Sequence, residues 1–203
     1  MVQGIISDMG NVLVSFDNTI FFNNISPHSC FSPQEISNLF QANVKLLGDF
    51  DLGLISEDEF FHTFKKIMKL NLEKDQFFQI YNDIFSLNPE PTNILRHLRN
   101  RYRLVLLSNT DPQRFNFILE KFPQIKFFDE YVLSFEVKMM KPDPGIYQLA
   151  LKKANCRPEE AVFIDDRWEN IEAARRVGIN SIFYLPEKTD LREELKRLGV
   201  AVD

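Results

Sequence analysis

The stretch Ala161-Val162-Phe163-Ile164-Asp165-Asp166 decides the fold of this 203-residue chain. It is a short apolar run that ends in two carboxylates, and such runs are typical of strands buried on both faces of a parallel sheet. Three further apolar runs also end in polar residues: Gly4-Ile5-Ile6-Ser7-Asp8, Leu104-Val105-Leu106-Leu107-Ser108-Asn109 and Tyr131-Val132-Leu133-Ser134. A fifth run, Ser181-Ile182-Phe183-Tyr184, follows Gly178. We therefore expect these runs to form one sheet.

Helical patterns separate the predicted strands. They cover residues 92–100, 112–122, 144–155, 168–177 and 190–198. Strands that alternate with helices indicate an α/β fold with a doubly wound, mainly parallel sheet. In such sheets ligands bind at the carboxyl ends of the strands, near the point where the strand order reverses. We therefore expect the polar residues that close three of the runs, Asp8, Ser108-Asn109 and Asp165-Asp166, to converge on one crevice.

Residues 16–88 interrupt this alternation, because they show helical patterns and no convincing strand. Ser32-Pro33-Gln34-Glu35 and Ser56-Glu57-Asp58-Glu59 each have the form of a capping box at the start of a helix. Twelve of the twenty phenylalanines lie in this region, and helices packed on one another explain them better than an aromatic wall over a substrate. The sequence predicts a core of residues 1–15 and 89–203, with residues 16–88 as a small helical cap inserted after the first strand.

Composition and charge narrow the function classes. The chain is 44% hydrophobic and 26% charged, as soluble globular proteins are. Its net charge of -5 argues against a nucleic-acid partner. It shows neither an apolar run of membrane-spanning length nor a basic leader, so we expect a cytoplasmic protein without a membrane partner, either monomer or homodimer. Cys30 and Cys156 have no metal or redox spacing, and unpaired thiols are the preferred interpretation.

Four motifs carry a family resemblance. In chain order they are Asp8 in Ile6-Ser7-Asp8-Met9-Gly10-Asn11-Val12-Leu13, then Ser108-Asn109-Thr110, then Lys141-Pro142-Asp143, and last Asp165-Asp166 with Asn170. Together they resemble the motifs of the haloacid-dehalogenase superfamily, whose core is Rossmann-like, and the helical insertion sits where a small cap sits in that family. The Gly10-Asn11-Val12 variant is most similar to bacterial sugar-phosphate phosphatases of the glucose-1-phosphatase kind, and phosphatase domains fused to epoxide hydrolases are also similar.

The resemblance implies an enzyme that hydrolyses a small phosphorylated metabolite through an aspartyl-phosphate on Asp8. A phosphate monoester is a dianion, so an anionic nucleophile approaches it only where cations neutralise both partners. Mg²⁺ suits carboxylate and carbonyl ligands, and Lys141 adds a fixed positive charge. The implied metal ligands are Asp8, the Gly10 carbonyl, Asp166 and, directly or through water, Asp165. Ser108 and Asn109 are expected to contact the phosphate, and Asn170 to orient Lys141 or the metal-binding carboxylates.

One position departs from the family pattern. Most phosphatases that the chain resembles carry a second Asp two residues after the nucleophile as acid and base, and here that position is Gly10. Three hypotheses follow: a phosphatase without this carboxylate, a metal-independent 2-haloacid dehalogenase, or a non-enzymatic phosphate-binding or interaction protein. A departing halide needs neither magnesium nor protonation, so Asp165-Asp166 argues against the dehalogenase. Intact Asp8 and Lys141 argue against a protein without activity, and we favour the magnesium-dependent phosphatase.

Overall fold

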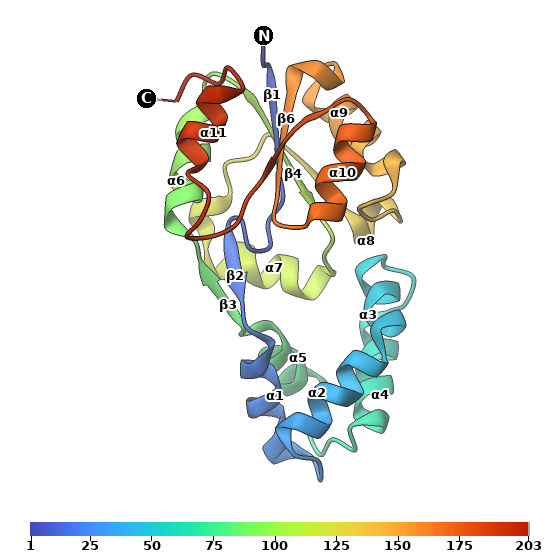
Figure 1. Ribbon diagram of the computed structural model, residues 1–203. Helices are drawn as coiled ribbons and strands as arrows, with labels where there is room; N and C mark the ends of the chain where they lie inside the picture. Colours follow the sequence, from blue (N-terminus) through green and yellow to red (C-terminus); the bar gives the residue numbers. More distant parts are fainter. Residues whose placement is uncertain (203) are drawn as a thin grey trace.

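The computed structural model describes residues 1–202 and places the apolar runs side by side in one sheet (Figure 1). All four pairings between neighbouring strands are parallel, and the order is β5-β4-β1-β6-β7. The strands are β1 (Gly4–Ser7), β4 (Arg103–Ser108), β5 (Glu130–Leu133), β6 (Ala161–Asp165) and β7 (Asn180–Phe183). The order reverses direction on either side of β1, so the doubly wound α/β fold expected from the sequence is confirmed.

Helices cover both faces of this sheet because successive strand residues point to opposite sides. Ile6 and Phe163 pack on one face with α9 (Pro144–Ala154) and α10 (Trp168–Arg176). Ile5 and the apolar residues beside it on the adjacent strands pack on the opposite face. This face is covered by α6 (Pro89–Leu98), α7 (Pro112–Lys121) and α11 (Leu191–Arg197). The shortest helical elements are α8 (Ser134–Val137) and three 3₁₀ turns at Ser26–His28, Pro123–Ile125 and Pro158–Glu160.

A helical segment, residues 18–82, lies beyond the carboxyl ends of the strands (Figure 1). It consists of α1 (Asn18–Ile25), α2 (Pro33–Ala42), α3 (Val44–Asp51), α4 (Glu57–Ile67) and α5 (Lys74–Asn82). Ser32 and Ser56 form the two expected capping boxes with Glu35 and Glu59. Phenylalanine rings pack on one another inside the segment, as Phe50 does on Phe60 with ring centroids 4.1 Å apart. Most of its aromatic residues therefore form a core.

Two short strands connect the helical segment to the sheet region. β2 (Val14–Phe16) pairs antiparallel with β3 (Phe85–Leu87), so residues 16–88 are not free of strand as the sequence pattern suggested. A three-residue strand is too short to show a period-2 pattern, and this pair forms only because the chain returns to the same place 70 residues later. Across residues 1–202, none of the helices is both long enough and apolar enough to cross a membrane.

Candidate active site

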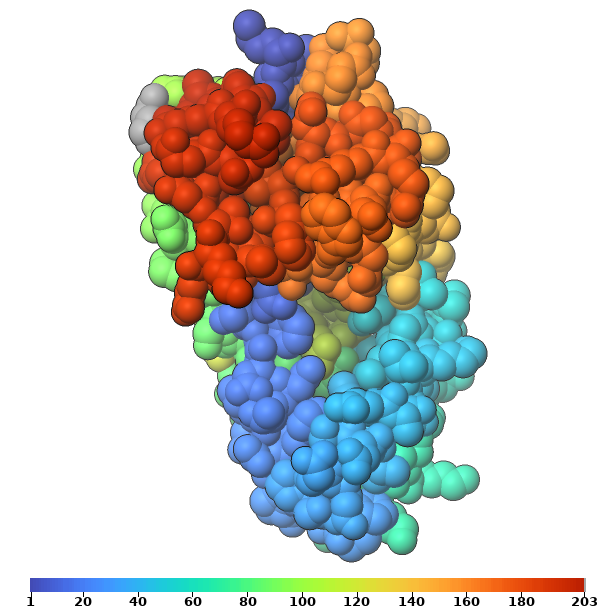
Figure 2. Space-filling view, viewed as in Figure 1, coloured from blue at the N-terminus to red at the C-terminus, as the bar shows by residue number. Residues whose placement is uncertain are grey.

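A cleft of about 400 Å³ opens at the carboxyl edge of the sheet. It lies where the orange and red part of the core in Figure 2 meets the blue residues of the first part of the chain, just before the helical segment begins. Parallel strands end at one edge, so the loops after β1, β4 and β6 bring their polar residues together here. The lining residues are Asp8, Gly10, Asn11, Phe16, Asn109, Lys141, Asp166, Arg167 and Asn170. Seven of these nine belong to the motifs that the sequence singled out.

Lys141 is the central charge of the cleft. Its side chain is buried, and Nζ lies 2.8 Å from Asp8 Oδ1 and 2.7 Å from Asp165 Oδ2. Nζ also donates to the Leu107 carbonyl at 3.0 Å. An ammonium group has three N–H donors, so these three acceptors saturate it. The ammonium group is therefore fixed between the two carboxylates.

The carboxylates of the cleft outnumber the cation buried among them. Burial raises the pKa of Asp8 to about 7, even though Lys141 opposes this shift. Burial also raises the pKa of Asp166, partly offset by the hydrogen bond from Asn11. Burial by itself would lower the pKa of Lys141, but the charges of Asp8 and Asp165 outweigh it, and the net shift is upward. A further cation in the cleft would favour the ionised form of the carboxylates.

Asp165 and Asp166 are adjacent in sequence and face different partners. Asp165 is fully buried, and besides Lys141 it accepts hydrogen bonds from the Asn170 amide at 3.0 and 3.1 Å and from the Arg167 N–H at 2.8 Å. Asp166 lines the cleft and accepts from Asn11 Nδ2 at 2.8 Å. Asn170 thus contacts the carboxylate that holds Lys141, and the orienting role expected of it stays a prediction.

The site has a donor set that fits a hard divalent cation. Asp8, Asp165 and Asp166 each offer a carboxylate oxygen, and these atoms lie within 4.8 Å of one another. Oxygen-only ligands at an anionic site suit Mg²⁺. Because the Asp165 oxygens already accept four hydrogen bonds, Asp8 and Asp166 have more capacity for direct ligation. The roles of Asp165 and the Gly10 carbonyl as ligands stay predictions.

Ser108 and Asn109, at the carboxyl end of β4, have different surroundings. Ser108 is buried at the end of the strand. The Asn109 side chain donates to the Lys141 carbonyl and accepts from the Lys141 N–H, both at 2.8 Å. The Asn109 amide therefore holds the loop that carries Lys141. The phosphate contacts expected of Ser108 and Asn109 stay predictions.

Three lining residues were not assigned a role from the sequence. Asn11 adopts a left-handed backbone conformation with φ of 53°, which asparagine tolerates better than most residues, and this conformation accompanies its bond to Asp166. Phe16 is 42% exposed at the end of β2, and Arg167 is exposed and paired with Glu169. Glycine and asparagine are typical of turns, so the Gly10-Asn11 pair could have indicated the conformation of Asn11 from the sequence. Phe16 and Arg167 have no distinguishing pattern.

A buried polar cluster connects the helical segment to the core beside this site. Asp111 N-caps α7, where its Oδ1 accepts from the Arg114 N–H at 2.8 Å, and its Oδ2 accepts from the Tyr81 hydroxyl at 3.0 Å. The Arg114 guanidinium lies 4.0 Å from the centre of the Tyr81 ring. Asp51, the last residue of α3, adds a second carboxylate, and its burial, followed by the charge of Asp111, raises its pKa to about 7.

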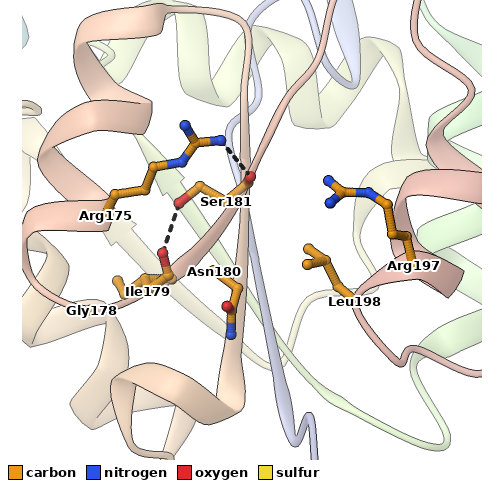
Figure 3. Close-up of a pocket in the computed structure, with 7 residues that line it drawn as sticks. All are labelled: Arg175, Gly178, Ile179, Asn180, Ser181, Arg197 and Leu198. Carbon is orange, nitrogen blue, oxygen red and sulfur yellow. Dashed lines mark hydrogen bonds between the residues drawn. The ribbon is translucent and has the colours of Figure 1, made fainter.

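A second hollow, of about 330 Å³, lies at the opposite edge of the sheet (Figure 3). Arg175 and Arg197 point toward it from α10 and α11, and Asn180 and Ser181 begin β7 there. Arg175 donates to the Ser181 carbonyl at 3.2 Å, while Arg197 pairs with Glu194 at 2.6 Å. Both arginines already have protein partners, and the hollow contains none of the motif residues.

Residues 2–178 match the family model described as haloacid dehalogenase-like hydrolase. Among solved structures, a family enzyme of Bacteroides thetaiotaomicron in complex with magnesium and inorganic phosphate superimposes with a TM-score of 0.84 at 25% identity. That alignment covers 94% of this chain and 98% of the other. The fold of this chain is thus similar to that of a family enzyme whose structure contains magnesium and inorganic phosphate.

Two of the curated relatives are named for different activities. A drimenol cyclase of Aspergillus calidoustus is 25% identical over 204 residues, which cover 98% of this chain and 37% of that protein. A D-ribitol-5-phosphate phosphatase of B. thetaiotaomicron is 32% identical over 105 residues, which cover 48% of this chain and 50% of that protein. The alignments thus span between about a third and a half of the length of these curated relatives.

Proposed function

The chain belongs to the haloacid dehalogenase-like hydrolases, and on that premise we propose that it is a magnesium-dependent phosphatase for a small phosphate monoester. The observation that carries the proposal is the position of the Lys141 ammonium, 2.8 Å from Asp8 and 2.7 Å from Asp165, with Asp166 lining the same cleft. A buried nucleophile, a fixed cation and a further carboxylate then surround one space. Relatives with phosphatase names support the choice of substrate class.

Asp8 is the proposed nucleophile, because its carboxylate is fixed at one oxygen. Oδ1 accepts the Met9 N–H at 2.7 Å and faces Lys141, and neither group engages Oδ2. Oδ2 forms the bond to phosphorus while the bond from phosphorus to the leaving oxygen breaks. The electron pair of that bond leaves with the oxygen. Water then hydrolyses the aspartyl-phosphate and releases inorganic phosphate, and the Asp8 carboxylate is restored.

Asp8 and Asp166, with the Gly10 carbonyl, would hold Mg²⁺, which when bound supplies positive charge to the phosphate oxygens. Lys141 supplies a second positive charge and keeps Asp8 in place. Ser108 and the backbone N–H groups of the loop after β4 would meet the remaining phosphate oxygens. Charge neutralisation and positioning are the main contributions expected in phosphoryl transfer.

The test is hydrolysis of a panel of phosphate esters by purified protein with Mg²⁺ or with EDTA. We expect turnover only with Mg²⁺. Asp8→Asn and Asp166→Asn should each lower kcat/KM by about 10³-fold or more. Asp75→Asn, which neutralises an exposed carboxylate in the helical segment, is the control and should leave turnover intact. Equal inactivity of wild type and Asp8→Asn toward the whole panel would contradict the proposal, and metal-independent halide release from a 2-haloacid would identify a dehalogenase instead.

A further inference from the structure

Resting on the proposed function, we propose that this cleft cleaves phosphate esters whose leaving groups depart without a proton, and that the aspartyl-phosphate on Asp8 accumulates during turnover. The substrate class is then acyl, enol, aryl and anomeric phosphates rather than phosphates of ordinary alcohols. The inference comes from the ionisable side chains that line the cleft, together with Asp17 and the three histidines.

The cleft-lining side chains are already committed or are not acids. All three Lys141 N–H groups are used by Asp8, Asp165 and the Leu107 carbonyl. Asp8 is the nucleophile, and Asp166 is the carboxylate that Asn11 orients. The other polar side chains lining the cleft are amides, which do not ionise near neutral pH and so cannot serve as general acids, and the guanidinium of Arg167, which stays protonated.

Side chains next to the cleft do not supply the proton either. Asp17 follows Phe16, but its Oδ1 accepts from the Thr19 N–H at 2.8 Å and the Thr19 hydroxyl at 2.7 Å as the N-cap of α1. His62 lies on α4 and His97 on α6, each with Nδ1 against a backbone carbonyl of its own helix. His28 belongs to the turn after α1. None of the three histidines lines the cleft.

Gly10 is the place where a proton carrier would fit. Its φ lies outside the left-handed region, so the backbone does not require glycine there. A Cβ at this position would meet only the Phe16 ring edge, at 3.6 Å, which is ordinary van der Waals contact. The fold therefore has room for a side chain that the sequence omits, and the lack of an acid is a property of this chain rather than a steric necessity.

The chemical consequence differs between the two half-reactions. In the first, the phosphorus–oxygen bond breaks and the electron pair stays on the leaving oxygen, which takes a proton from water only after departure. Its rate therefore follows the stability of that oxyanion. In the second, water attacks phosphorus without a positioned base and loses its proton to the solvent, while the bond to Asp8 breaks and the electron pair returns to the carboxylate. With a good leaving group the second half-reaction becomes the slower one, so the intermediate accumulates.

The experiment measures kcat, kcat/KM and pre-steady-state bursts with Mg²⁺ for aryl, acyl and alkyl phosphates in wild type, Gly10→Asp and Gly10→Asn. For wild type we expect kcat/KM to fall steeply as the leaving-group pKa rises. We also expect kcat to be nearly constant among good leaving groups, with a burst close to one equivalent per enzyme. Gly10→Asp should flatten the dependence by raising kcat/KM for alkyl phosphates about 10²–10⁴-fold, the usual contribution of a positioned general acid.

Gly10→Asn is the matched control, because its amide has the shape of the Asp side chain and cannot transfer the proton. The Asn variant is compared by slope alone, because the carbonyl of residue 10 is a proposed magnesium ligand and its overall rate can change. Its kcat/KM should fall as steeply with leaving-group pKa as that of wild type. An active wild-type enzyme with a flat dependence and no burst would overturn this inference and leave the proposed phosphatase standing. Equal effects of Asp and Asn at position 10 would also overturn it. No turnover of any phosphate ester or acyl phosphate would instead overturn the proposed function itself. If Gly10→Asp fails to fold, as judged by circular dichroism, the wild-type dependence and burst decide alone.

Discussion

The side chain of Asn109 holds the backbone of Lys141 at both of its polar groups, through two hydrogen bonds of 2.8 Å. Asn109 closes the strand run of β4, and Lys141 lies 32 residues further along the chain. The lysine whose ammonium joins Asp8 to Asp165 is thus fixed at its main chain by the neighbouring loop. This arrangement gives Asn109 a positioning role that its place in the sequence did not reveal.

Asn109→Ala should therefore lower kcat more than it raises KM. Loss of the two hydrogen bonds frees the Lys141 loop and should reduce the free energy of unfolding by about 1–2 kcal/mol. Steady-state kinetics and urea unfolding measure the two effects. Asn180→Ala, which removes an exposed amide from the other edge of the sheet, is the control. If kcat is unchanged while KM and the inhibition constant of inorganic phosphate both rise, Asn109 binds phosphate instead.

Lys141→Met should be both inactive and less stable. The substitution leaves Asp8 and Asp165 buried without their cation, and breaking a buried ion pair in this way costs about 3–5 kcal/mol. Urea unfolding without metal at neutral pH measures the loss. The loss should shrink in acid, because protonated carboxyls need no counter-charge.

Lys153→Met provides the comparison for the lysine substitution. Lys153 donates to the Tyr131 carbonyl and pairs with Glu130 on the half-exposed surface of the core. Its loss should change stability only slightly at any pH. A Lys141→Met protein as stable as Lys153→Met at neutral pH would show that the buried carboxylates do not depend on this cation.

Asp51→Asn should change how stability depends on pH. Burial raises the pKa of Asp51 in the folded protein from 3.8 to about 7, so the folded state binds this proton more tightly than the unfolded state does. The stability it contributes is complete below pH 3.8 and is lost as pH rises to about 7. Asparagine stays neutral, so the variant should exceed wild type above this window by on the order of 2 kcal/mol.

Unfolding midpoints measured across this pH range test that expectation. Asp49→Asn, in the same helix, removes a carboxylate paired with Lys45 and should leave the wild-type pH dependence in place. Parallel stability curves for wild type and Asp51→Asn would contradict the expected proton uptake at the contact between the helical segment and the core.

Gly53→Ala should destabilise the turn between α3 and α4, through which the helical segment contacts the core. Gly53 has φ of +60°, and a Cβ there would come within 2.5 Å of both the Phe135 carbonyl oxygen and Lys138 Nζ. Lys138 donates to the Gly53 carbonyl, which adds a second contact between this turn and the core. The backbone clash should cost more than about 1 kcal/mol, which thermal unfolding detects.

Gly48→Ala is the matched control for that turn. Gly48 lies inside α3, where a Cβ would meet nothing within 4 Å. Alanine is the better helix former, so this variant should gain about 0.5–1 kcal/mol. Equal effects of the two substitutions would show that the contact of Gly53 with Phe135 does not restrain the helical segment.

The sequence predicted the features whose physical causes are local. Continuous apolar runs mark strands buried on both faces, and the run at 161–166 contains β6, which ends one residue earlier, at Asp165. Ser32 and Glu35 are three residues apart, so their capping box depends on one turn of helix alone. Asp8 and Asp165 end apolar runs, and the rule that parallel strands end at one edge was enough to bring them together.

Features that depend on distant residues meeting needed the tertiary structure. β3 forms because the chain returns at Phe85–Leu87 to pair with β2, and a three-residue strand is too short for its sequence pattern to be recognised. Phe16 lines the cleft only because β2 follows the loop after β1 at the carboxyl edge of the sheet. Asp51 lies near enough to Asp111 for its pKa to respond only because the helical segment packs against the core. The fold class and the motif residues could therefore be inferred from the sequence, whereas the strand order and the partners of Lys141, Asn109 and Asp165 were decided by the tertiary structure. Hydrogen-bond geometry is fixed only when all the elements that carry the partners are in place.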